Sequence, residues 1–128
     1  MDSTAIVTAL ALIQYIVLSI RVGQARGQYG VEAPATTGHP VFERQFRVHQ
    51  NTLEQLIIFI PALWLFAYYV SNRLGALLGL AFIAGRALYA SGYVADPKQR
   101  STGFGVSMVS ALLLLAGGLI GALVHAFK

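Results

Sequence analysis

Long apolar stretches alternate with short polar ones along the chain, and four of the apolar stretches are long enough to cross a bilayer. They predict helices at about residues 4–26, 41–70, 73–94 and 101–127. Crossing the hydrocarbon core takes about 20 apolar residues, and a helix satisfies its own backbone hydrogen bonds in lipid whereas an open strand does not. We therefore predict an all-α integral membrane protein, with residues 1–128 forming one domain, a four-transmembrane-helix bundle.

The connections contain the residues that end helices. Gly27 to Pro40 is rich in Gly, Pro and Thr and predicts a loop, Ser71 to Arg73 predicts a tight turn, and Asp96 to Lys98 opens a third connection. The second helical pattern begins near Pro40 or Phe42, before its apolar part, so we expect its first turns to project into the headgroups or water. Pro61 removes a helical hydrogen bond and predicts a kink.

Basic residues are divided unevenly between the two sides of the predicted bundle. The first and third connections are flanked by Arg21, Arg26, Arg44, Arg47, Lys98 and Arg100, whereas the other side has Arg73 and Lys128. The positive-inside rule therefore places the first and third connections in the cytoplasm and both termini on the opposite side. The abundance of Ala, Gly and Leu favours a bacterial inner membrane.

Composition narrows the chemistry. Only 11% of the 128 residues are charged, whereas a soluble domain is about a quarter charged. The net charge of +4 is small and scattered, which argues against nucleic acid and favours anionic lipid or an anionic small molecule as a partner. With no cysteine and only three histidines, the chain predicts no metal site. Any thiol chemistry would use a thiol carried by a substrate.

Two predicted helices carry polar residues at helical spacing. On the second, Arg47, Asn51 and Glu54 follow i, i+4, i+7, and on the third, Arg86, Tyr89 and Tyr93 follow i, i+3, i+7, so each set shares one face. An ionisable group within a bilayer is costly and marks a functional site with a partner by default. The antiparallel order brings both faces to one membrane level. We expect a basic, tyrosine-lined pocket with one carboxylate there, open to the cytoplasm or to a subunit interface.

The same residues also have purely structural explanations. Glu54 can form an ion pair with Arg86 or with Arg47. The two tyrosines of the third helix fit the aromatic belt of a membrane interface. Arg100 fits a topology charge, and His49 fits a solvated position on its helix.

Three segments together resemble the signature of the MAPEG family, the membrane-associated proteins in eicosanoid and glutathione metabolism. They are Phe42 to Glu54 (FERQFRVHQNTLE), Gly85 to Tyr93 with its Arg-x-x-Tyr-x-x-x-Tyr pattern, and Arg100 to Phe104. The segments occur in the family's order and spacing, and the resemblance extends from about Arg26 to the C-terminus. It implies a homotrimer of four-helix subunits that binds glutathione, as a co-substrate, between neighbouring subunits.

The resemblance also implies a role for each polar residue. The positions that match glutathione contacts of the family are Arg26, Arg47, Asn51, Glu54, Arg86, Tyr89 and Tyr93. Of these, Arg26 would reach the tripeptide of a neighbouring subunit. Arg100 matches the arginine that lies near the sulfur and favours the thiolate, which makes it the candidate catalytic residue.

This chemistry is sound apart from the resemblance. Glutathione has two carboxylates, which arginine binds through bidentate, charge-assisted hydrogen bonds. Its amino group needs a carboxylate, and Glu54 is the one embedded among the arginines. A nearby cation makes a thiol more nucleophilic by favouring its ionised form, and one unit of thiol pKa corresponds to about 1.4 kcal/mol.

The sequence thus predicts a glutathione transferase that attacks hydrophobic electrophiles from the bilayer, with lipid-hydroperoxide peroxidase activity as an addition. A non-catalytic lipid-binding scaffold, resembling the five-lipoxygenase-activating branch, is the alternative from another class; that branch lacks an arginine at the position of Arg47. A glutathione-dependent eicosanoid isomerase is a further alternative. A small multidrug transporter is disfavoured, because its glutamate lies in the first helix without an arginine cluster.

Overall fold

The computed structural model describes all 128 residues as helices joined by short connections. The helices are α1 (Asp2–Tyr29), α2 (Pro40–Tyr69), α3 (Asn72–Ala95), the short 3-10 helix η1 (Pro97–Arg100) and α4 (Ser101–Ala126). Four segments are long and apolar enough to cross a membrane, with η1 continuing into α4. The prediction of an all-α chain with four helices of membrane-spanning length is confirmed; the single domain and the homotrimer stay predictions.

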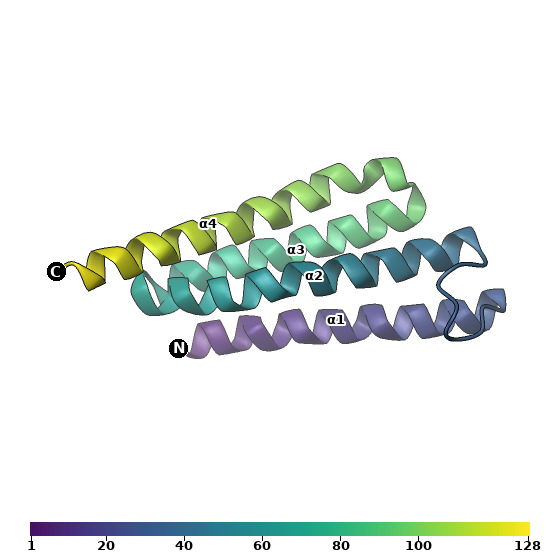
Figure 1. Ribbon diagram of the computed structural model, residues 1–128, viewed down its shortest axis with the longest axis horizontal. Helices are drawn as coiled ribbons and strands as arrows, with labels where there is room; N and C mark the ends of the chain where they lie inside the picture. Colours follow the sequence, from purple (N-terminus) through teal and green to yellow (C-terminus); the bar gives the residue numbers. More distant parts are fainter.

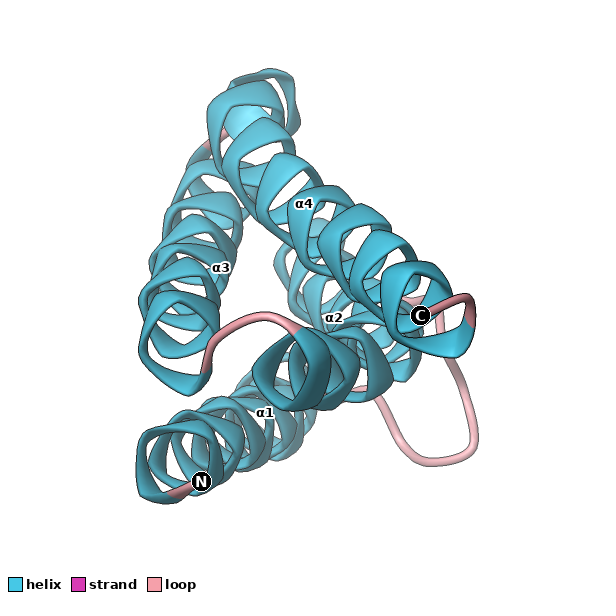
Figure 2. Cartoon of the chain, turned by 90° about the vertical axis from the view of Figure 1, so that its left-hand side faces the viewer, coloured by secondary structure: helices cyan, strands magenta, loops and turns pink.

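The four long helices lie side by side and alternate in direction. Both termini lie at one end of the bundle with the α2–α3 turn, and the α1–α2 loop and η1 lie at the other end (Figure 1). Viewed along the bundle, α2 is central (Figure 2). It packs against α1, α3 and α4, and α3 also contacts α1 and α4. The residues on α2 and α3 that face one another at the η1 end can therefore form one site.

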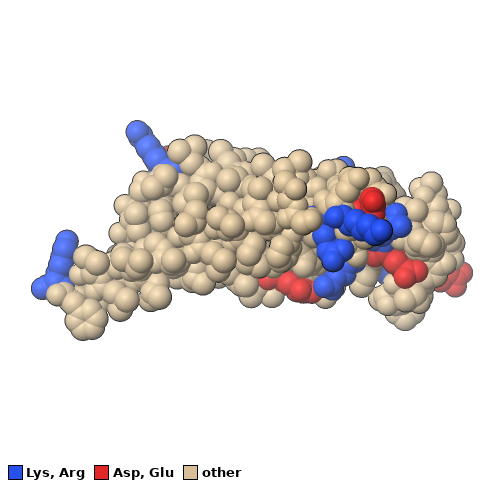
Figure 3. All heavy atoms as spheres, turned by 90° about the horizontal axis from the view of Figure 1, so that it is seen from above, with Lys and Arg blue, Asp and Glu red and all other residues tan.

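The core and the surface are both apolar, as expected of a protein that folds in lipid. Phe59 of α2 and Phe82 of α3 stack with their ring centroids 3.9 Å apart at the centre of the main core cluster. Large side chains such as Ile57 and Leu77 lie on the outside. Charged side chains gather at the η1 end, and the opposite end shows a few basic ones (Figure 3). The basic residues are thus divided unevenly between the two ends, as the sequence predicts.

Two connections are shorter than the sequence predicts. The loop was expected from Gly27, but α1 continues to Tyr29 and ends at Gly30, which adopts the left-handed conformation (φ 68°) typical of a helix C-terminus. The turn expected at Ser71 to Arg73 is also shorter, because Asn72 already belongs to α3. Ser71 caps α3 by accepting a hydrogen bond from the amide of Leu74. α2 runs through Pro61 as one helix.

Small residues let α3 and α4 pack with their backbones in contact. A Cβ atom on Gly103 of α4 would collide with the backbone nitrogen of Tyr89 and would lie 2.7 Å from the carbonyl oxygen of Gly85. Gly92 of α3 likewise faces the carbonyl oxygen of Gln99 in η1, 2.7 Å from an added Cβ. These contacts press η1 and the start of α4 onto the tyrosine-bearing end of α3.

Replacing Gly103 with alanine should destabilise the bundle, because the rigid backbone of α3 must move to admit the methyl group. Overpacking of this kind costs about 1–3 kcal/mol. The Gly105→Ala variant is the matched control on the same helix, since nothing lies within 4 Å of its Cβ. Thermal unfolding in detergent, followed by circular dichroism, should show a lower midpoint for Gly103→Ala alone. Equal midpoints for the two variants would contradict this packing.

Candidate active site

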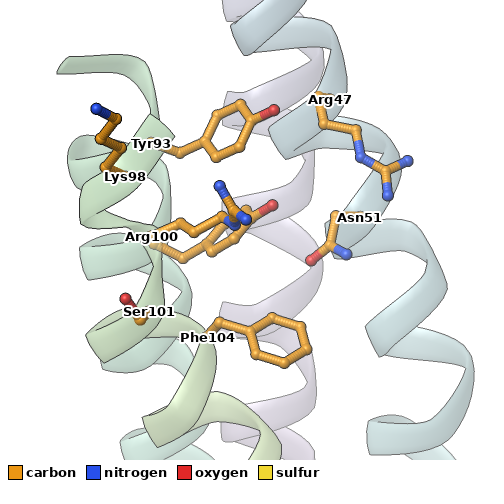
Figure 4. Close-up of a pocket in the computed structure, with 8 residues that line it drawn as sticks. Arg47, Asn51, Tyr93, Lys98, Arg100, Ser101 and Phe104 are labelled. Atoms are coloured by element: carbon orange, nitrogen blue, oxygen red, sulfur yellow. The ribbon is translucent and has the colours of Figure 1, made fainter. Parts of the chain in front are cut away.

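A cavity of about 860 Å³ opens between α2, α3 and the η1–α4 segment, at the end of the bundle where charged residues gather (Figure 4). Its lining combines three cationic side chains, three aromatic rings and two neutral polar groups. These residues are Arg47, Asn51, Tyr89, Tyr93, Lys98, Arg100, Ser101 and Phe104. The carboxylate that we expected in the pocket, that of Glu54, is not part of this lining. The cavity therefore offers a net positive environment to a ligand.

The residues of α2 face those of α3 and η1 across this cavity. Arg47 and Asn51 project from one wall, while Tyr93 and Arg100 point towards them from the other, above Phe104 (Figure 4). Spacing of i, i+4 on α2 puts Arg47 and Asn51 on the same face. The Tyr89 and Tyr93 rings, also four residues apart, stack with centroids 5.5 Å apart.

The position of Arg100 follows from the turn that precedes α4. Pro97 begins η1, and Asp96 caps it by accepting a hydrogen bond from the amide of Lys98 at 3.1 Å. The Arg100 guanidinium donates to the Pro97 carbonyl at 2.8 Å. Arg100 itself is solvent-exposed, so most of the guanidinium's donors remain free for a ligand.

Arg86 is fully buried next to this cavity without lining it. Its Nη2 atom donates to the side-chain oxygens of Asn51 (2.8 Å) and Thr52 (2.9 Å). Its Nη1 atom donates to the Ser107 hydroxyl at 3.4 Å, and the guanidinium carbon lies 4.3 Å from the centroid of the Tyr89 ring. A buried cation needs such partners because burial without them is very unfavourable.

The ion pair considered between Glu54 and Arg86 is not formed. Glu54 instead lies 3.7 Å from Arg47, and the side chains of both are about half exposed (50% and 53%). The rotation of α2 about its axis explains why Glu54 pairs with Arg47 and not with Arg86. It turns Asn51 and Thr52 towards the interior of the bundle and leaves Glu54 at the edge of the bundle. An exposed pair at this distance contributes little stability. Arg47 therefore remains free to exchange Glu54 for a ligand carboxylate.

Two further predicted residues lie outside the cavity. Arg26 donates to the carbonyl oxygen of Ala35 at 2.7 Å and lies over the Phe42 ring, 4.8 Å from its centroid. His49, expected to be solvated, is partly buried instead: its Nε2 atom is 2.8 Å from the Ser19 hydroxyl and its ring stacks on Tyr15. No group of three or more His, Cys, Asp or Glu side chains could hold a metal ion.

Comparison with known proteins assigns the chain to a family. The model of the MAPEG family matches residues 4–120. The chain belongs to the MAPEG family. The resemblance drawn from the three motifs is thereby confirmed, and a MAPEG chain with four membrane-length helices is a multi-pass membrane protein.

Individual relatives align with almost the whole of this MAPEG chain. Microsomal glutathione S-transferase 2 of Homo sapiens is 44% identical over 116 residues, which cover 90% of this chain and 79% of that protein. Leukotriene C4 synthase of Bos taurus is 33% identical over 121 residues, covering 94% and 81%. An uncharacterized protein of Synechocystis sp. is 49% identical over 119 residues, covering 93% and 87%.

Sequence reasoning missed several residues that build this MAPEG site. Thr52 and Ser107 hold the Arg86 guanidinium, and Ser101 and Phe104 complete the cavity wall. Arg44 donates to the carbonyl oxygen of Val94 at 3.2 Å and so ties α2 to the end of α3. Hydroxyl groups and phenylalanine are common on membrane helices, so their spacing gave no signal that distinguished them. The position of Thr52 next to Asn51 was the one usable clue.

The Thr52→Val variant should be less stable than the parent protein, because it removes a hydrogen bond to a buried charge without changing side-chain volume much. A bond of this kind contributes about 1.5–3 kcal/mol. Ser91→Ala is the control, since the exposed Ser91 hydroxyl bonds only within its own helix. Unfolding midpoints in detergent should fall for Thr52→Val and stay constant for Ser91→Ala. A Thr52→Val midpoint equal to that of the parent would show that Thr52 does not stabilise Arg86.

Proposed function

We propose that this protein is a membrane-bound glutathione transferase, which joins the glutathione thiolate to hydrophobic electrophiles that enter from the bilayer. The observation that supports it most is the cavity itself, where Arg47, Lys98 and Arg100 meet without a lining carboxylate. A peptide with two carboxylates and an ionisable thiol complements that charge. Relatives named microsomal glutathione S-transferase 2 and leukotriene C4 synthase give the proposal further support.

Binding would use both walls of the cavity. Arg47 binds one carboxylate of glutathione. Glu54, 3.7 Å from Arg47 at the rim of the cavity, accepts hydrogen bonds from the ammonium group. Asn51 contributes its amide nitrogen. Because Arg86 already donates to the Asn51 oxygen at 2.8 Å, the NH₂ group of Asn51 is left for an acceptor on the ligand.

Arg86 therefore acts as a positioning residue in this proposal, in place of the direct glutathione contact that the motif implies. Its guanidinium fixes the side-chain amide of Asn51 and lies against the ring of Tyr89. Tyr89 and Tyr93 then form the apolar and hydroxyl-bearing floor on which the tripeptide lies.

Arg100 is the proposed catalytic residue. Its cationic guanidinium favours ionisation of the thiol, whose proton leaves to water in the open cavity. The thiolate sulfur then forms a bond to the electrophilic carbon, and the leaving group departs with the electron pair of the bond that breaks.

The proposal extends to assembly and location. Within its own subunit Arg26 lies outside the cavity lining. A homotrimer would bring the Arg26 side chain of one subunit to the cavity of the next. The charge asymmetry along the bundle supports a cytoplasmic cavity in a bacterial inner membrane (Figure 3). Reduction of lipid hydroperoxides by the same thiolate is a proposed additional activity.

The Arg100→Ala variant should bind glutathione but ionise it less. Removing the cation raises the thiol pKa by about one unit, which corresponds to about ten-fold less thiolate at neutral pH. The deficit should shrink as the pH rises, because the thiol then ionises without help. Ultraviolet absorbance of the thiolate, titrated with glutathione in detergent at several pH values, measures this directly.

Arg21→Ala is the control, since Arg21 is an exposed arginine of α1 outside the cavity. It should leave the thiolate signal unchanged. A signal equally strong in Arg100→Ala and the parent protein would remove Arg100 from catalysis. If the parent protein neither binds glutathione nor shows thiolate absorbance, the transferase proposal fails and a lipid-binding scaffold becomes the better description.

A further inference from the structure

A second concave surface lies at the opposite end of the bundle, between the first turns of α1 and α3. It is a groove of about 520 Å³ whose walls are mainly apolar, with Ile6 and Leu10 on one side and Leu77 and Leu80 on the other. Arg73 and Ser3 stand at its outer end, where both helices begin. From Ser3 to Leu10 the groove follows α1 for about 10 Å.

The groove has a fixed shape because α1 and α3 are joined beneath and beside it. Asn72 Oδ1 accepts hydrogen bonds from the backbone nitrogen (3.1 Å) and the hydroxyl group (2.6 Å) of Thr4, which is fully buried. Deeper down, Gly79 packs so closely on Val7 that an added Cβ would lie 2.6 Å from a Val7 methyl carbon. Neither wall belongs to a loop, so the groove exists before any ligand arrives.

Arg73 is an exposed cation without a protein partner. The structure's one ion pair, between Arg47 and Glu54, lies at the other end of the bundle. Arg73 also takes part in none of the side-chain hydrogen bonds around it, which join Thr4 to Asn72 and Leu74 to Ser71. A guanidinium group at the membrane surface with free donors favours a phosphate, which it binds in bidentate fashion.

We propose that this groove is a binding site for an anionic phospholipid in the leaflet opposite the glutathione cavity. The phosphate lies on Arg73 with the Ser3 hydroxyl as a second donor, and the upper part of one acyl chain lies between Leu77 and Leu10. A net negative headgroup complements the unpaired arginine, whereas the ammonium group of a zwitterionic headgroup competes with it. The site is independent of the transferase proposal, since it shares no residue with the cavity.

Tryptophan fluorescence can test the site, because the chain has a single tryptophan. In a Trp64→Phe background, Leu77→Trp places the probe at the groove, where the native side chain is 64% exposed. Leu119→Trp is the matched control, since Leu119 is 56% exposed on α4 and lies at a similar distance from the same end of the bundle. Each protein is reconstituted with chain-brominated phosphatidylglycerol or phosphatidylcholine, which quench by contact.

We expect brominated phosphatidylglycerol to bind next to the groove probe about five-fold more strongly than brominated phosphatidylcholine, as one arginine at a membrane surface can provide. At the control position, the ratio of quenching by brominated phosphatidylglycerol to quenching by brominated phosphatidylcholine should be near one. Adding Arg73→Gln should reduce the ratio at the groove to that of the control. Equal ratios at the two positions, or a groove ratio that Arg73→Gln leaves unchanged, would overturn the proposal.

Discussion

The buried guanidinium of Arg86 is the interaction on which the arrangement of the other polar residues depends. It lies on α3 and donates to side chains of α2 and α4, so a single charged group connects three helices. A bilayer interior makes a buried cation very unfavourable unless hydrogen-bond partners compensate its charge. Both terminal nitrogens of Arg86 have such partners, whereas its Nε atom has none. The helices are therefore held in the one rotation that presents Asn51, Thr52 and Ser107 to it. The cavity wall formed by Asn51 follows from that constraint.

The second requirement is close backbone contact between α3 and the segment after it. Gly103 admits the backbone of Tyr89, and Gly92 admits the carbonyl oxygen of Gln99. Larger residues at either position would push η1 away from α3 and move Arg100 away from the cavity that Tyr93 also lines. The site therefore needs two kinds of residue at once, because the charged and aromatic groups supply the chemistry and the glycines bring them together. In the sequence, only the charged and aromatic residues indicate a site, because glycine is common in membrane helices.

The helices and the polar faces were predictable because both follow from periodicity and length alone. The hydrogen-bond partners of Arg86 were not predictable, and the geometry of α2 shows why. At 3.6 residues per turn, Arg47 and Glu54 project within about 20° of each other, whereas Thr52 projects on the far side of Asn51. Spacing groups these residues but does not say which edge of the face turns inward. Packing of α2 against three neighbours sets that rotation, and no single helix contains this information.

The end of α1 shows the same limit on a smaller scale. The sequence predicted that the first helix ends before Gly27, but it continues to Tyr29 and ends at Gly30, whose left-handed conformation places the Val31 amide on the carbonyl oxygen of Arg26 at 3.1 Å. Arg26 consequently stays on a helix, and its side chain extends over Phe42 instead of into a flexible loop. An arginine held on a rigid element keeps a defined direction, which a neighbouring subunit could use. The helix end at Gly30 thus leaves Arg26 within the last turn of α1, where the helical backbone fixes its position.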